Sequence, residues 1–178
     1  FTDVLLRRGA ASVVSVDVGY GQLAWKLQSD PRVEVHDRTN VRTLDPASVA
    51  PAPGIVVGDM SFISLTLVLP ALVAAAAPDA DFLLMVKPQF EIGKERLGHG
   101  GVVRNPEHHV ETVENVARCA IGLGLDIAAI APSPLPGPSG NVEYFLYMRR
   151  DYPEPINPQE LTEYIRRAVA EGPAGGAL

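Results

Sequence analysis

The chain has 178 residues, of which 47% are hydrophobic and 20% charged, and its formal net charge is −6. This composition is typical of one globular domain with its own core and excludes a disordered chain. Proteins that bind nucleic acid unaided usually carry a positive net charge, which this chain lacks. The negative net charge still allows action on RNA delivered by another module.

The first segment, FTDVLLRRG, is typical of the middle of a helix that ends at Gly9. Because the chain opens on Phe1, we expect its natural beginning to lie upstream. Downstream, β-branched runs alternate with helix-like segments. Strands are predicted at residues 12–18, 33–36, 54–57, 82–86, 125–131 and 142–148. Helices are predicted at 22–28, 62–77, 106–123 and 158–170, the last three with Ser61, Asn105 and Asn157 as N-caps.

This alternation predicts an α/β fold with a mostly parallel sheet and helices on both faces. The last two strands have no helix between them and are expected to form an antiparallel edge pair. We expect the domain to cover residues 1–170 and a flexible tail to cover 171–178. Two loops rich in glycine or proline, 89–104 and 132–140, follow strands, and ligands of open α/β sheets bind beyond strand ends.

Four ionisable residues interrupt the predicted strands at or near their ends: Asp17, Asp59, Lys87 and Glu143. An acid at the position of Asp17 is suited to ribose hydroxyls, and it is equally typical of a solvated strand end. Asp59 and Lys87 predict either a structural salt bridge or a reactive pair, because a buried charge needs a partner. Pro88 restricts the Lys87 backbone to extended geometry and so fixes the direction of the amine. Glu143 is a third partner or an edge-strand acid facing water.

Other residue types give little support for different chemistry. The single cysteine, Cys119, excludes an internal disulfide, and the four histidines lack the spacing of a metal site, so no metal is expected. Trp25 is interpreted as a core residue. No apolar run reaches the roughly 20 residues of a membrane span, and the given sequence does not start with a basic-then-apolar signal segment, so we expect a cytoplasmic protein without membrane association.

Several motifs together resemble one family. The segments VVSVDVGYGQLAWKLQSDPRV, RTNVR, GDMSFISL, VKPQFE, GGVVR and PSGNVEYFLY are similar to the TlyA family, also called hemolysin A. The resemblance covers the chain to about residue 170. It implies a Rossmann-like, FtsJ-like domain that uses S-adenosyl-L-methionine to methylate the 2′-hydroxyl of cytidine in 16S or 23S ribosomal RNA.

The resemblance also implies roles for individual residues. It implies a Lys-Asp-Lys-Glu tetrad whose first lysine lies upstream and whose other members are Asp59, Lys87 and Glu143. The implied cofactor-binding residues are Phe1, Thr2, Asp17, Arg38, Thr39, Asn40 and Asp59. The glycine-rich cofactor turn and an S4-like RNA-binding domain are expected upstream. Without them the chain is expected neither to bind the cofactor normally nor to turn over.

The implied reaction explains a lysine at the end of a buried strand. A lysine accepts the proton of a 2′-hydroxyl only as a free amine, which requires a pKa lowered from ~10.4 towards 7–8. Lys87 is therefore expected to be the base or the orienting donor. Ribosomal RNA or a ribosomal subunit is the expected partner, and Lys94, Arg96 and Arg104 are expected to add contacts to RNA.

Two alternatives belong to other classes. A NAD-dependent Rossmann oxidoreductase shares the sheet and the acid after its second strand, but it needs a fingerprint that these residues lack. A non-catalytic RNA-binding or haemolysin-type module is the other alternative, and no basic amphipathic helix supports membrane insertion by it.

Overall fold

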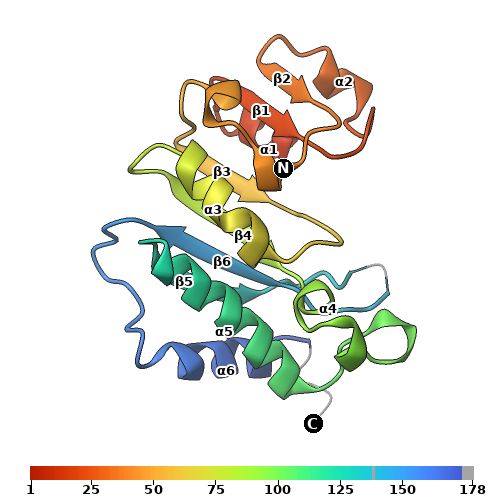
Figure 1. The fold of residues 1–178 in the computed structure, drawn as a ribbon, viewed down its shortest axis with the longest axis vertical. Helices are drawn as coiled ribbons and strands as arrows, with labels where there is room; N and C mark the ends of the chain where they lie inside the picture. Colours follow the sequence, from red (N-terminus) through yellow and green to blue (C-terminus); the bar gives the residue numbers. More distant parts are fainter. Residues whose placement is uncertain (138, 174–178) are drawn as a thin grey trace.

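The structure is a computed structural model that describes residues 1–137 and 139–173 (Figure 1). Residues 174–178, most of the predicted tail, lie outside the described part. Two sheets form the framework, one with two strands and one with four. Within the described ranges, no helix has both the length and the apolar character needed to cross a membrane.

The N-terminal part holds the two-stranded sheet, drawn in red and orange in Figure 1. Helix α1 (Thr2–Arg7) precedes strand β1 (Val13–Val16), and helix α2 (Trp25–Gln28) precedes strand β2 (Val33–His36). The two strands are parallel, with Val13 opposite Val33. Two 3-10 turns, Val41–Thr43 and Pro46–Val49, lead to the second sheet.

The four-stranded sheet has the order β3-β4-β6-β5. Strands β3 (Ile55–Gly58) and β4 (Asp81–Val86) are parallel. Strand β6 (Tyr144–Arg149) lies antiparallel to both β4 and β5 (Asp126–Pro132). The predicted antiparallel pairing of the last two strands is confirmed. However, β6 lies inside the sheet, where it brings its first residue to the rim at which β3 and β4 end.

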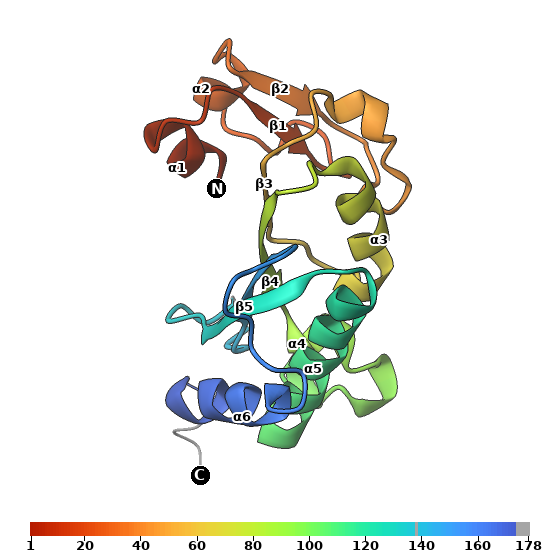
Figure 2. The ribbon, with the colours of Figure 1, turned by 90° about the vertical axis from the view of Figure 1, so that its left-hand side faces the viewer.

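The helices pack mainly on one face of the four-stranded sheet. Helices α3 (Leu65–Ala75) and α5 (Pro106–Gly122) lie over this face, and α6 (Leu161–Glu171) lies beside α5 (Figures 1 and 2). A short helix α4 (Pro88–Glu91) and two 3-10 turns, Lys94–Arg96 and His99–Gly101, lie between β4 and α5. The fold is therefore α/β, as the sequence predicts.

Alternating side chains of β4 and β6 form the core. Phe82, Leu84 and Val86 on β4, with Tyr144, Leu146 and Met148 on β6, have no measurable exposure. Full burial of one such side chain is worth about 1.5–3 kcal/mol relative to exposure. The neighbouring positions of β4 are less buried, and Leu83 is 36% exposed. The central strands therefore pack against the helices through this buried face, and the polar residues at the strand ends follow directly from these packed strands.

Local capping signals decide where α5 begins and ends. The Asn105 side chain accepts a hydrogen bond from Glu107 N–H at 3.0 Å, and Pro106 occupies the first turn. Gly124, with a φ of +83°, follows the last turn in the left-handed region that glycine tolerates. The predicted start of this helix is confirmed, and its end at Gly122 lies one residue before the predicted end.

The sheet differs from the expectation of a mostly parallel sheet with helices on both faces, because β6 makes the four-stranded sheet mixed and the helices lie mainly on one of its faces. Three local expectations are wrong. Helix α3 begins at Leu65 with Ser64 as its N-cap, so the segment from Ser61 to Ser64 is not helical. Helix α6 begins at Leu161, because the Asn157 side chain caps the preceding turn through Gln159 N–H. Trp25 is 78% exposed and belongs to no core.

Candidate active site

Lys87 is the centre of a polar cluster at the rim of the four-stranded sheet. It follows β4 directly and has the extended backbone that Pro88 imposes, with φ −115° and ψ 99°. Its Nζ lies 2.6 Å from Asp59 Oδ1 and 3.7 Å from Glu143 Oε1. Nζ also donates a hydrogen bond to Ser61 Oγ at 3.2 Å. The structure therefore brings together the three tetrad positions that this chain contains.

The two carboxylates have different surroundings. The Asp59 side chain, just beyond β3, is 49% exposed and can meet a ligand. The Glu143 side chain is only 8% exposed, because it precedes β6 in the interior of the sheet. The alternative of Glu143 as an edge-strand acid facing water is thus wrong. A buried carboxylate needs such partners, because an unpaired charge in the interior is costly.

Gln89 was missed in the sequence, although it follows Lys87 by only two positions. Its Nε2 donates a hydrogen bond to Glu143 Oε1 at 3.0 Å. The opposite amide orientation would set two oxygens against each other, so the network fixes the orientation. Gln89 Oε1 is buried, and it has no hydrogen-bond partner among the residues that the structure describes.

Phe62 is the most unusual residue at this rim. Its φ is 63°, which is uncommon for a residue with a Cβ and costs on the order of 1–3 kcal/mol. The side chain is 90% exposed, and its ring centroid lies 4.9 Å from that of Phe90. The expectation that Phe62 is helical hid this feature. Phe62 is therefore an exposed aromatic residue with strained backbone, three positions after Asp59.

Glu91, the last residue of α4, binds the start of α3. Its Oε2 accepts a hydrogen bond from Ser64 Oγ at 2.5 Å, and its Oε1 accepts one from Leu65 N–H at 2.7 Å. Burial raises the pKa of this carboxyl above its ordinary value, while these two hydrogen bonds oppose the shift. Glu91 thereby helps to cap the start of α3.

The predicted cofactor-binding residues lie mostly in the N-terminal part. Asp17 is exposed just beyond β1, and its Oδ1 accepts a hydrogen bond from Gly19 N–H at 2.7 Å. Backbone bonds join this loop to the next one, since Thr39 N–H donates to Asp17 O at 2.9 Å. The Arg38 guanidinium lies 4.5 Å from the centroid of the Tyr20 ring. The two loops after β1 and β2 thus form one continuous surface around Asp17.

The remaining predicted cofactor positions are less informative. The Asn40 side chain caps the 3-10 turn that follows it by accepting Arg42 N–H at 3.0 Å. Phe1 is 50% exposed, and its carbonyl accepts Leu5 N–H within the first helix. Thr2 begins that helix. None of these contacts distinguishes a cofactor site from ordinary helix capping.

The three predicted RNA-contacting residues have unequal freedom. Arg96 forms a two-pronged ion pair with Glu111 on α5, with N–O distances of 2.6 and 2.7 Å. This pairing raises the pKa of Arg96 and lowers that of Glu111. Arg104 donates to the carbonyl of His99 at 3.3 Å, whereas Lys94 is exposed. Lys94 is therefore the best placed of the three to meet a phosphate.

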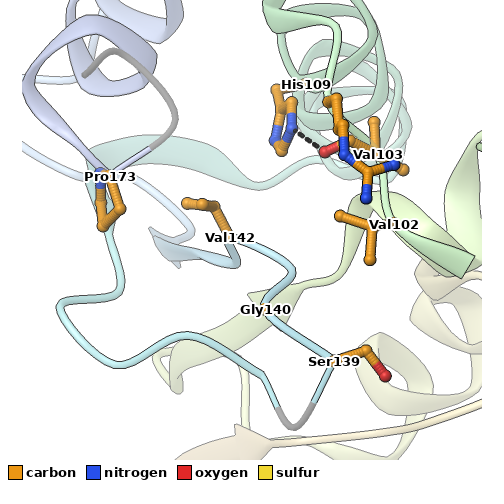
Figure 3. Close-up of a pocket in the computed structure, with 8 residues that line it drawn as sticks. Val102, Val103, His109, Ser139, Gly140, Val142 and Pro173 are labelled. Atoms are coloured by element: carbon orange, nitrogen blue, oxygen red, sulfur yellow. Dashed lines mark hydrogen bonds between the residues drawn. The ribbon is translucent and has the colours of Figure 1, made fainter. Parts of the chain in front are cut away.

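Figure 3 shows a cavity of about 380 Å³ whose lining includes none of Asp59, Lys87 and Glu143. Val102, Val103 and Arg104 line one side, and Ser139, Gly140 and Val142 line another, with His109 and Pro173 completing the wall. His109 uses both ring nitrogens, one with Val103 O at 2.9 Å and one with Tyr144 Oη at 3.1 Å. Burial lowers the pKa of His109, and the partners of its two ring nitrogens indicate a structural role.

No group of three metal-ligating side chains occurs within residues 1–137 and 139–173. The arrangement instead offers an amine, an exposed carboxylate and a buried carboxylate at one sheet rim, with a second acid beyond β1. An α/β domain of this kind is a ligand-binding enzyme domain, a class in which ligands lie beyond the carboxyl ends of strands.

Comparison with known proteins specifies the class. Residues 1–150 match the model of the FtsJ-like methyltransferases, and the chain belongs to this family. It is 53% identical over 173 residues to a Mycobacterium tuberculosis protein named 16S/23S rRNA (cytidine-2'-O)-methyltransferase TlyA, which confirms the resemblance seen in the motifs. That alignment covers 97% of this chain and 65% of the relative, so the chain spans about two thirds of its length.

Solved structures agree with this assignment. One from Streptococcus thermophilus has a TM-score of 0.86 and 36% identity, and the match covers 96% of this chain and 62% of that chain. A SAM-dependent methyltransferase from Methanosarcina mazei has a TM-score of 0.56 and 14% identity, with 83% of this chain and 86% of that chain covered. The second likeness concerns the fold alone. The expected Rossmann-like methyltransferase fold is thus confirmed.

Proposed function

We propose that the protein methylates the 2′-hydroxyl of cytidine in ribosomal RNA, with S-adenosyl-L-methionine as methyl donor. The observation that carries the proposal is the position of two carboxylates: those of Asp59 and Glu143 each lie within 4 Å of the Lys87 amine. The name of the M. tuberculosis relative supplies the substrate class. Ribosomal RNA or a ribosomal subunit is the proposed partner.

The cluster can perform the proton transfer that this reaction needs. The cofactor, when bound, supplies an electrophilic methyl group on a sulfonium. With the cofactor bound, Lys87 in its free-amine form would take the proton of the ribose hydroxyl, and the cofactor would supply the methyl group for the ribose oxygen. Asp59 holds the amine in place, and buried Glu143 balances the lysinium that forms. General base catalysis contributes about 10²–10⁴-fold, and alignment of the reacting atoms supplies the rest.

The chain's own residues suit the proposed cofactor. The exposed carboxylate of Asp17 lies at the end of β1, where an acid accepts hydrogen bonds from ribose hydroxyls. Arg38 and Thr39 hold the neighbouring loop against it, as their N–H groups donate to Gly19 O at 2.8 Å and Asp17 O at 2.9 Å. These residues, with Asn40, Phe1, Thr2 and Asp59, are the proposed cofactor-binding set.

Access to a ribose hydroxyl in folded RNA is helped when the nucleotide leaves its stack. Phe62 offers an exposed aromatic ring three residues after Asp59, and stacking of one base on an aromatic side chain is worth about 1–3 kcal/mol. Lys94, Arg96 and Arg104 are the proposed RNA contacts of this domain. Since the net charge is −6, most phosphate contacts belong to a separate RNA-binding part, for which we propose an S4-like domain.

The test is methyl transfer from labelled S-adenosyl-L-methionine to ribosomal RNA by the complete natural protein, followed by mass mapping of the modified nucleotide. Lys87→Arg keeps the charge but cannot readily release a proton, so we expect transfer to fall at least 100-fold. Lys26→Arg, an exposed lysine on α2, is the matched control. Normal transfer by Lys87→Arg would remove the base role.

A ligand titration separates this proposal from the oxidoreductase alternative. Stabilisation of the complete protein by S-adenosylhomocysteine, followed as a rise in melting temperature, supports a methyltransferase. Stabilisation by NAD and not by S-adenosylhomocysteine would contradict it. The non-catalytic alternative predicts no modified nucleotide in the mass map, whichever ligand binds.

A further inference from the structure

Helix α4 is only four residues long, yet two of its side chains reach two different parts of the active-site rim. It starts immediately after Lys87 and contains Pro88, Gln89, Phe90 and Glu91. Gln89 contacts the segment before β6, and Glu91 contacts the segment before α3. The three groups of the cluster come from three separate segments, and α4 touches the two that do not contain the lysine.

The first contact fixes Glu143. Gln89 Nε2 donates to Glu143 Oε1 at 3.0 Å, and this is the oxygen that lies 3.7 Å from the Lys87 amine. The amine is too distant for a hydrogen bond to that oxygen, so the amide holds the carboxylate more directly than the lysine does. Because Glu143 is 6% exposed, water does not readily replace the amide.

The second contact fixes the segment that carries Asp59. Glu91 accepts hydrogen bonds from Ser64 Oγ and Leu65 N–H at 2.5 and 2.7 Å. Ser64 ends the short stretch that begins at Asp59 and includes Ser61, itself a hydrogen-bond partner of Lys87 at 3.2 Å. The stretch has strained backbone at Phe62, and strained backbone persists only where its surroundings hold it.

We propose that Gln89 and Glu91 are positioning residues that hold Glu143 and the segment 59–64 around the Lys87 amine. The expected effect of these residues on kcat rests on the proposed methyl transfer. Among the described residues, the polar partners of the Lys87 amine are Asp59, Ser61 and Glu143, so neither Gln89 nor Glu91 contacts it directly. Loss of either one lets a carboxylate of the cluster move, and a misplacement of about 1 Å at a reacting centre can cost on the order of 100-fold in rate.

The kinetic test uses Gln89→Leu and Glu91→Ala in the complete natural protein, with Gln159→Leu and Glu154→Ala as exposed matched controls. We expect kcat for ribosomal RNA to fall at least tenfold in both variants. The KM for RNA and the Kd for S-adenosylhomocysteine should stay within about twofold of wild type. Glu91→Gln keeps an acceptor for Leu65 N–H and a donor for Ser64, so it should restore most of kcat. Equal losses in kcat and ligand affinity, or no rescue by Glu91→Gln, would contradict the proposal.

A second measurement does not depend on activity. The chain has three lysines, and Lys26 and Lys94 are exposed whereas the Lys87 side chain is 12% exposed. Acetylation by acetic anhydride, read by mass spectrometry, should be at least threefold faster at Lys87 in Gln89→Leu and Glu91→Ala, with the rates at the other two lysines unchanged. Glu91→Asp, one methylene shorter, serves as a second variant if Glu91→Ala does not fold.

The two measurements separate the two proposals. A wild-type protein that transfers no methyl group to ribosomal RNA defeats the proposed function, while the acetylation rates still decide the positioning roles. An active wild type with unchanged kcat and unchanged Lys87 acetylation in both variants defeats the positioning roles alone.

Discussion

Replacement of Lys87 by methionine should reveal how strongly the amine and Glu143 depend on each other. At 3.7 Å and an effective permittivity of about 20, the gross attraction of the two charges is about 4–5 kcal/mol. Desolvation of both groups offsets much of this attraction. Removal of the amine nevertheless leaves the carboxylate of Glu143, a residue that is only 6% exposed, without its cationic partner. We therefore expect Lys87→Met to lower the free energy of unfolding by about 2–4 kcal/mol.

The assay is a double-mutant cycle by urea unfolding at pH 7 and 25 °C. Glu143→Gln alone and the double variant Lys87→Met with Glu143→Gln complete the cycle. The double variant should recover at least half of the loss, because no buried charge remains, which corresponds to a coupling of about 1–3 kcal/mol. Lys26→Met is the control for an exposed lysine and should change stability by less than about 0.5 kcal/mol.

A particular result would refute this reasoning. If the effects of the two single changes on the free energy of unfolding add within about 0.3 kcal/mol, the amine and the buried carboxylate are not energetically coupled. Such additivity would also weaken the argument that Glu143 balances a lysinium during proton transfer.

Three further predictions concern other parts of the fold. Tyr144→Phe removes the hydroxyl that partners His109 Nδ1 at 3.1 Å, and it should cost about 1–3 kcal/mol in urea unfolding because a buried acceptor loses its donor. Asn105→Ala removes the α5 cap on Glu107 N–H and should cost about 1 kcal/mol in the same assay, with Asn105→Asp restoring it. Because burial raises the folded-state pKa of Glu91 above 4.5, its contribution to stability is complete below pH 4.5 and is lost as pH rises through the raised value. The stability of Glu91→Gln relative to wild type, from urea midpoints, should therefore increase between pH 4 and pH 7; a decrease would show that the two hydrogen bonds outweigh the desolvation.

The sequence predicts the parts of this site that local chemistry determines. Asp59 and Lys87 are conspicuous because each is a charge placed directly after an apolar strand, and Pro88 predicts the extended backbone of the lysine. The α5 boundaries follow from Asn105, Pro106 and Gly124, which act within one helical turn. Such signals are short-range, and the structure confirms them.

The features that were missed depend on contacts between distant segments. Ser61 and Ser64 are both acceptable N-caps, and Glu91, 27 residues after Ser64, supports the second of them. The burial of Glu143 follows from the strand order, in which β6 lies between β4 and β5, and no local pattern encodes that order. Trp25 was misread because a four-residue helix is too short for periodicity to indicate a buried face.

The antiparallel course of β6 also determines what happens at the far edge of the sheet. Asp81, Asp126 and Arg149 are aligned there, where two strands start and a third finishes. The turn at 150–153 departs from this edge, about six residues of strand away from the reacting groups, and Asp151 is exposed on it. A fluorophore or surface tether attached at this turn would therefore lie at the opposite end of strands β4 and β6 from the Lys87 cluster.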